Sequence, residues 1–418
     1  MRTSWNPCSK SLTTTITEEP TGAGKAAPQK NTLPHRTATQ EEMLMKALMI
    51  DQWLPNQPYA LELARPLTSH LSLTLITNRY YRPGSEPFRC KSVLESKVTE
   101  KRLGFLSYLR GLASLYGAVV FGRYDVVHLQ SFKKQRFEMP AFTAAKRLTR
   151  KKLVYTAHNI LPHEGAGKKE TETLKKWYRL CDAIIVHNEY SKKVLLGFEP
   201  SVEQKIHVIP HGTFDEYSPF VRKTPHEKTV FLQFGMIRKY KGIDDLLKAA
   251  SLLPQEYRKK LRVVIAGNQR KDLDDTDYQA ILDGYGVADC VEFLPRRVPD
   301  EQLPDYFNGA DCCLFPYKEI YGSGALLLAY TFGVPVIASA IPTFVEETEN
   351  GKTGLLYDPH NERGLTETIM RFVDLSAAEK AAMEKKIQNL CETKYNWDVS
   401  ARMLAEVYQR VTGKSARP

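Results

Sequence analysis

The sequence predicts an α/β protein with two doubly wound parallel sheets, one in each half of the chain. Its 418 residues exceed what one ordinary core can bury, and its 42% hydrophobic content suits a folded protein with two cores. Short β-rich runs alternate with helical segments, and this alternation starts twice. Such alternation is typical of parallel βαβ units covered by helices on both faces.

The first half predicts one lobe over residues 43–222. Strands are expected at residues 46–51, 72–77, 125–130, 152–157 and 183–187, with helical segments between them. Residues 1–42 are rich in Thr, Pro and Gly and have no apolar period, so we expect a disordered tail there.

The second half repeats the pattern after a polar, proline-containing linker at residues 217–228. Strands are expected at residues 230–235, 261–267, 290–294, 312–315 and 335–339. This predicts a second lobe over residues 229–395, facing the first across a cleft, and a C-terminal helix over residues 396–418 that crosses back. Open α/β sheets bind ligands at the carboxyl ends of their strands, so functional residues are expected in the strand-to-helix turns.

The net charge of +11 favours an anionic partner, because basic residues cluster at 133–136 and 146–152. A membrane surface or a phosphate-bearing substrate fits, and a merely solvated lysine-rich face is the alternative. Nucleic acid is excluded, since the chain has no recognised nucleic-acid motif and its basic residues are not interleaved with aromatics. The chain lacks both a membrane-length apolar run and a secretory signal, so we expect a cytoplasmic protein with reduced cysteines and no cysteine-based metal site.

Two cations follow the first strand of the second lobe. Arg238 and Lys241 stand just before an amphipathic helix at residues 243–252. A helix start has unpaired N–H groups and the positive end of the helix dipole, so it attracts anions. The pattern favours a diphosphate, with the Lys241 side chain expected in an open cleft, and two solvated loop cations are the alternative.

A turn of small residues, Tyr-Gly-Ser-Gly at 321–324, follows a later strand and opens a buried helix. Gly322 and Gly324 allow a ligand to approach the backbone closely, and the N–H groups of the following helix point toward it. Alone, such a turn is weak support for a site.

Together these segments resemble the family 4-type glycosyltransferases of the GT-B fold, especially bacterial enzymes of exopolysaccharide, lipopolysaccharide and glycolipid synthesis. The matching segments are FGMIRKYKGIDDLLKA, VVIAG, VEFLPRRVPDEQLPDYFNGADCCLFPY, YGSGALLLAYTFGVPVIAS and VEETENGKTGLLYDP. The resemblance implies transfer of a hexose-type sugar from a nucleotide-sugar donor to a saccharide or lipid-linked acceptor. It implies no metal and no separate cofactor.

The resemblance also assigns roles to residues. Arg238 and Lys241 would hold the donor diphosphate and neutralise the leaving group, and His158 would face the transferred sugar, which makes these three the expected catalytic residues. The remaining donor-binding residues would be Tyr317, Ser323, Gly324, Ala325 and Glu346. His187 and His211 also end strands and are weaker candidates.

The chain departs from the family pattern at two positions. Many members carry two glutamates eight residues apart around the small-residue turn, and Ile320 and Leu328 stand there instead. The usual ribose-binding carboxylate is therefore missing. This loss keeps two alternatives open: a nucleotide-sugar epimerase-like GT-B enzyme and a non-catalytic GT-B partner subunit.

Acceptor contacts are expected in the first lobe. Asn56 and Gln57 could bind acceptor hydroxyls while Trp53 or Tyr59 stacks on a sugar, or this loop could only shape a turn. His163 and Glu164 could also approach the acceptor, or cap a turn.

An apolar to amphipathic helix at residues 103–120 lies in the same lobe as the basic clusters. It could dock the protein on an anionic membrane at the inner face of the plasma membrane, and a core helix beneath a solvated face is the alternative.

Overall fold

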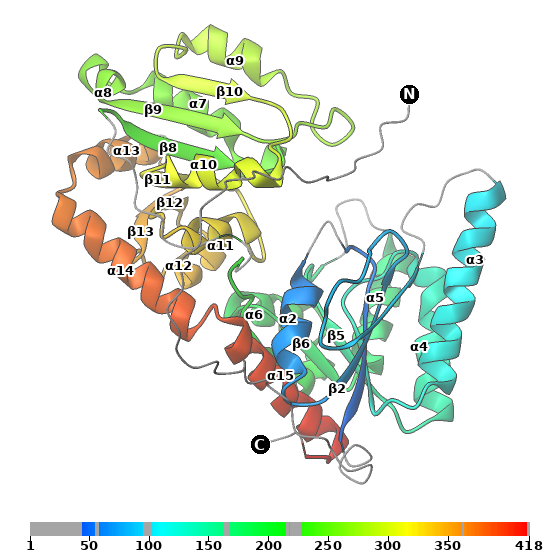
Figure 1. The fold of residues 1–418 in the computed structure, drawn as a ribbon. Coiled ribbons are helices and arrows are strands. Elements are labelled where there is room, and N and C mark those ends of the chain that lie inside the picture. Colours follow the sequence, from blue (N-terminus) through cyan, green and yellow to red (C-terminus); the bar gives the residue numbers. More distant parts are fainter. Residues whose placement is uncertain are drawn as a thin grey trace, which may run out of the picture. The chain divides into compact units, whose positions relative to one another are not determined.

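The computed structural model describes residues 44–54, 58–94, 102–161, 167–214, 217, 227–361 and 363–415, without the side chains of residues 102–105. The predicted tail lies outside the described residues, as do the four predicted acceptor residues Asn56, Gln57, His163 and Glu164. From Leu44 onward the chain is one compact unit. It contains two parallel sheets (Figure 1).

The first sheet has seven parallel strands in the order β3-β2-β1-β4-β5-β6-β7. Their bounds are β1 Lys46–Asp51, β2 Ser72–Asn78, β3 Arg89–Leu94, β4 Val126–Leu129, β5 Lys152–Thr156, β6 Ala183–Val186 and β7 Ile206–Val208. The sequence does not predict β3. This edge strand is mostly half-buried, so it needs no continuous apolar run.

Helices cover both faces of this sheet (Figure 1). One face packs on α2 (Tyr59–Leu67) and α15 (Trp397–Thr412). The other packs on α3 (Arg102–Tyr116), the π-helix η1 (Gly117–Phe121), α4 (Gln135–Leu148), α5 (Lys168–Leu180), α6 (Glu189–Phe198) and the 3-10 helix η2 (Pro200–Lys205). The lobe is therefore doubly wound.

The predicted helix at residues 103–120 is not α-helical throughout. It changes to the π-helix η1 at Gly117, and Lys151 reaches its end, where Nζ donates to the Val119 carbonyl at 2.9 Å. A buried cation that caps these carbonyls stabilises the wider turn, and it comes from a distant segment that local periodicity does not reveal.

The second sheet has six parallel strands in the order β10-β9-β8-β11-β12-β13. Their bounds are β8 Thr229–Phe234, β9 Leu261–Ala266, β10 Val291–Leu294, β11 Cys312–Phe315, β12 Val336–Ser339 and β13 Gly354–Tyr357.

This sheet is also covered on both faces, which confirms the predicted fold class. One face packs on α7 (Ile243–Ser251), α8 (Gln255–Lys260), α9 (Tyr278–Tyr285) and α13 (Gly364–Asp374). The other packs on α10 (Leu303–Asn308), α11 (Gly324–Thr331), α12 (Pro342–Glu347) and α14 (Ala377–Thr393). The 3-10 helices η3 (Lys239–Lys241) and η4 (Asp300–Gln302) complete the lobe.

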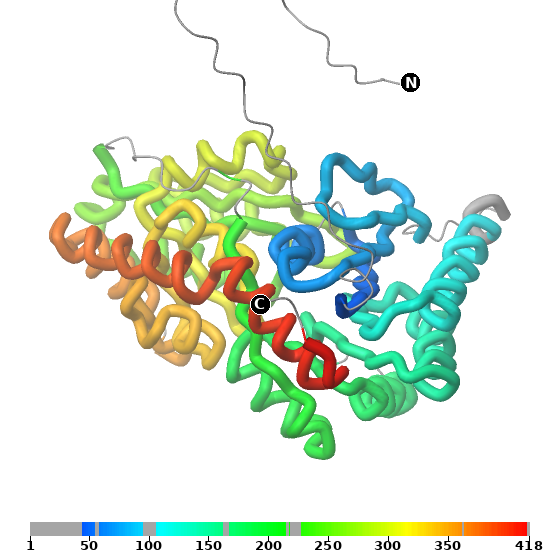
Figure 2. Tube along the Cα trace, turned by 60° about the horizontal axis from the view of Figure 1, so that its bottom comes forward, coloured from blue at the N-terminus to red at the C-terminus, as the bar shows by residue number. Residues whose placement is uncertain are grey.

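The last two helices join the two cores. The side chains of α14 pack in the second lobe, whereas α15 runs beside α2 of the first lobe (Figure 2). Trp397 donates from Nε1 to the Thr213 carbonyl at 2.6 Å, and Ser400 donates to the Pro210 carbonyl at 2.7 Å. These bonds fix the start of α15 to the segment after β7.

The strand order reverses beside the first strand of each lobe, between β1 and β4 and between β8 and β11. Ligands of open α/β sheets bind at such switch points, outside the carboxyl ends of the strands. The turns after β4, β8 and β11 are therefore the places to look for a site.

Candidate donor and transfer site

Glycines bring the ends of β8 and β9 into close contact in the second lobe. A Cβ on Gly267 would lie 1.9 Å from the Gly235 carbonyl oxygen, and Gly235 itself has a φ of +110°. Neither position tolerates a side chain without movement of the backbone. The backbone after β8 therefore has a conformation that requires glycine at both positions.

The turn after β8 meets the turn after β11. Gly242 links η3 to α7 with a φ of +66°, and a Cβ there would lie 1.9 Å from the Pro316 carbonyl oxygen. Lys318 donates its N–H to the Tyr240 carbonyl at 2.7 Å. The two segments that the sequence singles out thus lie together at the switch point of the sheet.

Lys241 is enclosed where these segments meet. Only 6% of its surface is exposed, and its Nζ lies 5.3 Å from the centre of the Tyr317 ring. A Cβ on Gly235 would lie 2.8 Å from the same Nζ, so the glycine makes room for the ammonium group. Burial, with a smaller contribution from the Arg238 cation, lowers the pKa of Lys241 to about 8.

The sequence-based expectation that Lys241 lies in an open cleft is therefore wrong. The aromatic ring of Tyr317 and the backbone at Gly235 cover the side chain, and both come from turns whose meeting depends on the tertiary fold. Arg238, which caps η3, remains half-exposed.

The small-residue turn is open to solvent on one side. Gly322 and Gly324 are exposed, and Ser323 caps α11 by accepting the Leu326 N–H at 3.2 Å. Tyr317 is buried beneath this turn, and Ala325 is half-buried. A ligand can reach the backbone here, while Leu328 lies in the core with 7% exposure.

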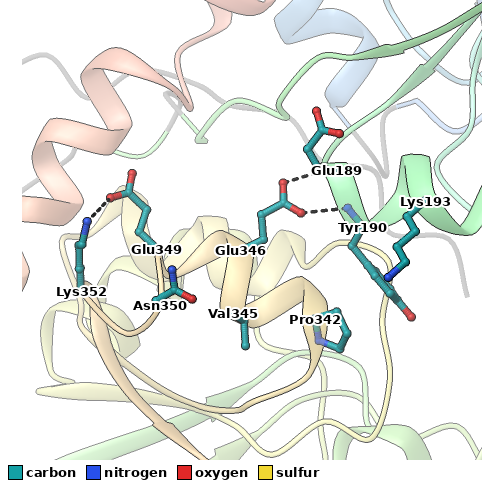
Figure 3. Close-up of a pocket in the computed structure, with 9 residues that line it drawn as sticks. All are labelled: Glu189, Tyr190, Lys193, Pro342, Val345, Glu346, Glu349, Asn350 and Lys352. Atoms are coloured by element: carbon teal, nitrogen blue, oxygen red, sulfur yellow. Dashed lines mark hydrogen bonds and ion pairs between the residues drawn. The ribbon is translucent and has the colours of Figure 1, made fainter. Parts of the chain in front are cut away.

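Glu346 points toward the first lobe. Its two carboxylate oxygens accept the backbone N–H groups of Glu189 at 2.8 Å and Tyr190 at 3.0 Å, at the start of α6 (Figure 3). A groove of about 640 Å³ surrounds it. Glu189, Tyr190, Lys193, Pro342, Val345, Glu346, Glu349, Asn350 and Lys352 line this groove. Because both oxygens already accept these N–H groups, the structure places Glu346 as a link between the lobes.

The sequence does not predict the neighbouring Glu347, which is buried beside the turn. Asn188, the cap of α6, donates to the Tyr321 carbonyl at 2.6 Å and lies 3.5 Å from a Glu347 oxygen. Burial raises the pKa of Glu347 to about 8, so the carboxyl group is protonated at neutral pH. Its position depends on contacts between distant segments, and no local pattern marks it.

Three histidines, His158, His187 and His211, lie together in the first lobe. His158 Nδ1 lies 3.1 Å from His187 Nε2, and His187 Nδ1 lies 3.0 Å from the Ile209 carbonyl oxygen. The Tyr59 ring stands edge-on to His158 at 4.7 Å and also contacts His187 and His211. The sequence identifies all three histidines, but only the fold reveals the bond between two of them.

These histidines are neutral at pH 7. Burial lowers the pKa of His158 well below its ordinary value, and the neighbouring histidines lower it further. Burial likewise lowers the pKa of His211 and of the deeper His128 to about 3, and lowers that of His187. An imidazole that stays neutral can act as a hydrogen-bond acceptor or a base.

Of the aromatic residues near the predicted acceptor loop, Trp53 is accessible and Tyr59 is not. Trp53 is 41% exposed, with Lys133 Nζ 5.5 Å from its ring centre, whereas Tyr59 is buried among the histidines. Of these two residues, only Trp53 can therefore stack on a sugar. Among the described residues, no group of three or more His, Cys, Asp or Glu could hold a metal ion.

Two protein-family models match the chain. The family model "Glycosyltransferase Family 4" matches residues 57–216, and "Glycosyl transferases group 1" matches residues 215–389. Two similar curated proteins are the D-inositol 3-phosphate glycosyltransferases of Streptomyces scabiei and Mycolicibacterium smegmatis. Each is 27% identical, over 314 and 319 residues respectively, which covers 69% of this chain and 68% of the relative.

Solved structures share the fold. Sucrose-phosphate synthase from Thermosynechococcus elongatus superposes with a TM-score of 0.69 and 18% identity, over 89% of this chain and all of that one. Anabaena Alr3699/HepE in complex with UDP and glucose gives 0.67 and 17%, over 88% of this chain and all of that one. WaaG, a glycosyltransferase of lipopolysaccharide biosynthesis, gives 0.61 and 14%, over 88% and 100%.

Proposed function

The chain belongs to the glycosyltransferases with the GT-B fold, and from this premise we propose that it transfers a hexose from a nucleotide-sugar donor to an acceptor hydroxyl. One observation carries the proposal: the turns after β8 and β11 meet at the switch point of the second sheet, with Lys241 enclosed between them. Relatives with the same fold support a nucleotide sugar, since HepE is described in complex with UDP and glucose.

In the proposed reaction, the bond between the sugar's anomeric carbon and the diphosphate oxygen breaks, and a bond to the acceptor oxygen forms. The acceptor hydroxyl gives up its proton to the leaving diphosphate or to solvent. Negative charge develops on the leaving diphosphate, where Lys241 and Arg238 stabilise it. The backbone at Ser323, Gly324 and Ala325 contacts the donor at the start of α11. His158 faces the transferred sugar as a neutral imidazole.

The buried Lys241 suits this task better than a solvated lysine does. An ammonium group that has already lost most of its hydration interacts more strongly with an incoming diphosphate. We propose that these two side chains neutralise the leaving group without a metal ion. Turnover should then be unchanged in excess EDTA, and restoration of lost activity by Mg²⁺ or Mn²⁺ would overturn this part of the proposal.

For the acceptor, we propose a saccharide or lipid-linked saccharide that stacks on the exposed Trp53 ring. The names of the similar curated proteins favour a second candidate, an inositol phosphate. Assays with both acceptor classes decide between them. Trp53→Ala should raise the acceptor KM and leave the donor KM unchanged.

A peripheral contact with an anionic membrane is part of the proposal. Leu106, Leu109 and Phe137 on α3 and α4 are exposed together with Arg110 and Arg136. Exposed apolar side chains among cations favour anionic lipid. No helix in the described part of the chain is long and apolar enough to span a bilayer.

Vesicle sedimentation tests this contact. Full-length protein should sediment with vesicles containing anionic phospholipid and remain in the supernatant with vesicles of phosphatidylcholine alone. Leu106→Ser combined with Phe137→Ser should abolish sedimentation. Equal partition with both vesicle types would speak against a charge-assisted membrane contact.

The function itself is tested with a panel of nucleotide sugars and acceptors. A transferase releases nucleoside diphosphate only when an acceptor is present, and forms one glycosylated product for each diphosphate. An epimerase-like enzyme instead converts the donor or releases diphosphate without an acceptor. A non-catalytic subunit neither turns over nor gains thermal stability with any donor in the panel.

A further inference from the structure

His187 and His158 form a directed hydrogen-bond pair. The Ile209 carbonyl oxygen can only accept, so the nitrogen beside it, His187 Nδ1, must carry a proton. A neutral His187 then has a lone pair on Nε2. That nitrogen lies 3.1 Å from His158 Nδ1, which must therefore donate.

We propose that His187 is a positioning residue that fixes the proton of His158 on Nδ1 and leaves His158 Nε2 as a bare hydrogen-bond acceptor. The main-chain carbonyl at Ile209 sets the direction of this pair. Neither ring needs a charge for the arrangement, and burial lowers the pKa of both.

The hydrogen bonds on the other side of His158 can run in the same donor-to-acceptor direction. In the structure the Gln130 amide oxygen lies 3.3 Å from His158 Nε2, and the amide nitrogen lies 3.4 Å from His128 Nε2. The two ends of an amide are assigned from their hydrogen bonds, and the direction of the histidine pair requires the reversed amide, in which the –NH₂ group donates to the unprotonated His158 Nε2. The amide oxygen then faces His128 Nε2.

The hydrogen-bond network ends at α15, and each of its bonds can pair one donor with one acceptor. With its proton on Nε2, His128 donates toward the Gln130 oxygen and Thr156 Oγ1, the latter at 2.8 Å. Its Nδ1 accepts from the Tyr408 hydroxyl at 2.6 Å. Every ring is neutral and every bond has one donor.

The opposite arrangement requires a buried charge. If His158 held its proton on Nε2, His187 would have to donate from both nitrogens, to Ile209 and to His158. His187 would then be an imidazolium, which burial opposes.

The consequence for transfer rests on the proposed function, whereas the position of the proton does not. An unprotonated Nε2 can accept a hydrogen bond from a hydroxyl of the transferred sugar in place of the Gln130 amide, whereas a protonated Nε2 could only donate to the hydroxyl oxygen. His158 is half-buried as a residue, so the fold does not enclose it completely.

The direct test is ¹⁵N NMR of full-length protein with labelled histidine, with the His158 signals identified by their loss in His158→Asn. We expect a protonated shift for Nδ1 and an unprotonated shift for Nε2 in the wild type. The reverse pattern in the wild type would overturn the proposal, and this measurement needs no activity.

Matched variants test the role of His187. In His187→Leu, the His158 proton should redistribute toward Nε2, and kcat should fall by about 10-fold or more with little change in donor KM. His187→Gln should retain both properties, because its amide can donate to Ile209 and accept from His158. His211→Leu, in the same aromatic cluster, is the control and should leave the His158 shifts unchanged.

An unchanged His158 tautomer in a folded His187→Leu protein would also overturn the proposal. If no donor and acceptor pair is turned over, the proposed function fails, while the NMR result still decides the position of the proton.

Discussion

Lys241 keeps its ammonium group almost out of contact with water, between the Tyr317 ring and the backbone at Gly235. Its pKa of about 8 lies below its unfolded value, so the folded protein binds fewer protons than the unfolded chain between these values. The charged form therefore costs folding free energy at neutral pH, and this cost disappears as pH rises through 8 and above. The proposed donor diphosphate would favour the charged form of Lys241, because its negative charge would stabilise the ammonium group.

Lys241→Met should separate function from stability. We expect kcat/KM to fall by about 10²- to 10³-fold, since a charge that stabilises the leaving group is lost. The melting temperature should stay equal or rise, because a buried cation is replaced by an apolar chain of similar length. Lys239→Met is the control: its side chain is 68% exposed and pairs with Asp275, so both properties should remain near wild type. A large loss of stability in Lys241→Met would contradict the account of its burial.

Local sequence patterns identify those functional residues whose position depends only on the strand and helix next to them in the sequence. Arg238, Lys241 and the Gly322–Gly324 turn all stand between a strand and a helix, so the sequence places them at a ligand-binding edge. The enclosure of Lys241 by Tyr317 could not be predicted, because 76 positions separate them in the numbering and only the fold joins their turns. The bond between His158 and His187 escapes prediction for the same reason.

The start of α6 shows how one element links the lobes. Glu346 accepts two N–H groups from the first turn of this helix, and Asn188 caps it while contacting the Tyr321 carbonyl. A carboxylate at a helix N-terminus also interacts favourably with the helix dipole. The position of α6 therefore depends on α12 of the other lobe.

Glu346→Gln should weaken this link. Loss of the charge should lower the free energy of unfolding by about 0.5–1 kcal/mol, and the effect should shrink in high salt. Glu406→Gln is the matched control, because its side chain is exposed in the middle of α15, away from any helix N-terminus. Urea unfolding of both variants at two salt concentrations measures the difference. Equal losses in both would remove the role assigned to Glu346.

Gly242 lies where η3, α7 and the turn after β11 meet. Gly242→Ala places a Cβ against the Pro316 carbonyl oxygen at a positive φ, so we expect a loss of more than ~1 kcal/mol in folding stability and a higher donor KM. Gly284→Ala in α9 is the control: nothing lies near its Cβ, and helix propensity should give a small gain. Thermal unfolding and donor kinetics of both proteins test the contrast.

At the element scale, the apolar pattern of the sequence predicts buried strands well and edge strands poorly. The expected strands of the first lobe correspond to β1, β2, β4, β5 and β6, whose residues are almost all buried, while β3 has a half-buried, partly polar sequence. The change from α3 to a π-helix depends on Lys151, which lies 30 or more positions away.

At the scale of the whole molecule, α15 ties the C-terminal end of the described chain to the first core. Trp397, Ala401, Leu404 and Tyr408 pack with α2 and the first strands. Alternation of strands and helices predicts two sheets, because each βαβ unit is local. Strand order and helix–core partners depend on contacts between distant segments.

Trp397→Phe should cost more than Trp177→Phe. Both indoles are fully or almost fully buried, but Trp397 Nε1 donates to the Thr213 carbonyl, whereas Trp177 Nε1 has no partner among the described residues. Trp397→Phe removes this buried hydrogen bond and Trp177→Phe removes none of the kind, so the difference in unfolding free energy should be about 1 kcal/mol. Urea denaturation measures both. If Trp177→Phe costs as much, the link through α15 contributes little.

Proton uptake on binding tests the central claim, that the donor diphosphate binds at Lys241, most directly. Calorimetric titration of wild type and Lys241→Met with a nucleoside diphosphate, in buffers of different ionisation enthalpy, measures the protons taken up. The pKa of Lys241 in the protein without ligand is about 8. The wild type should therefore take up about half a proton at pH 8 and close to one at pH 9. Lys241→Met should take up none. Tight binding by the wild type at pH 9 without proton uptake, or equal uptake by both proteins, would contradict the account.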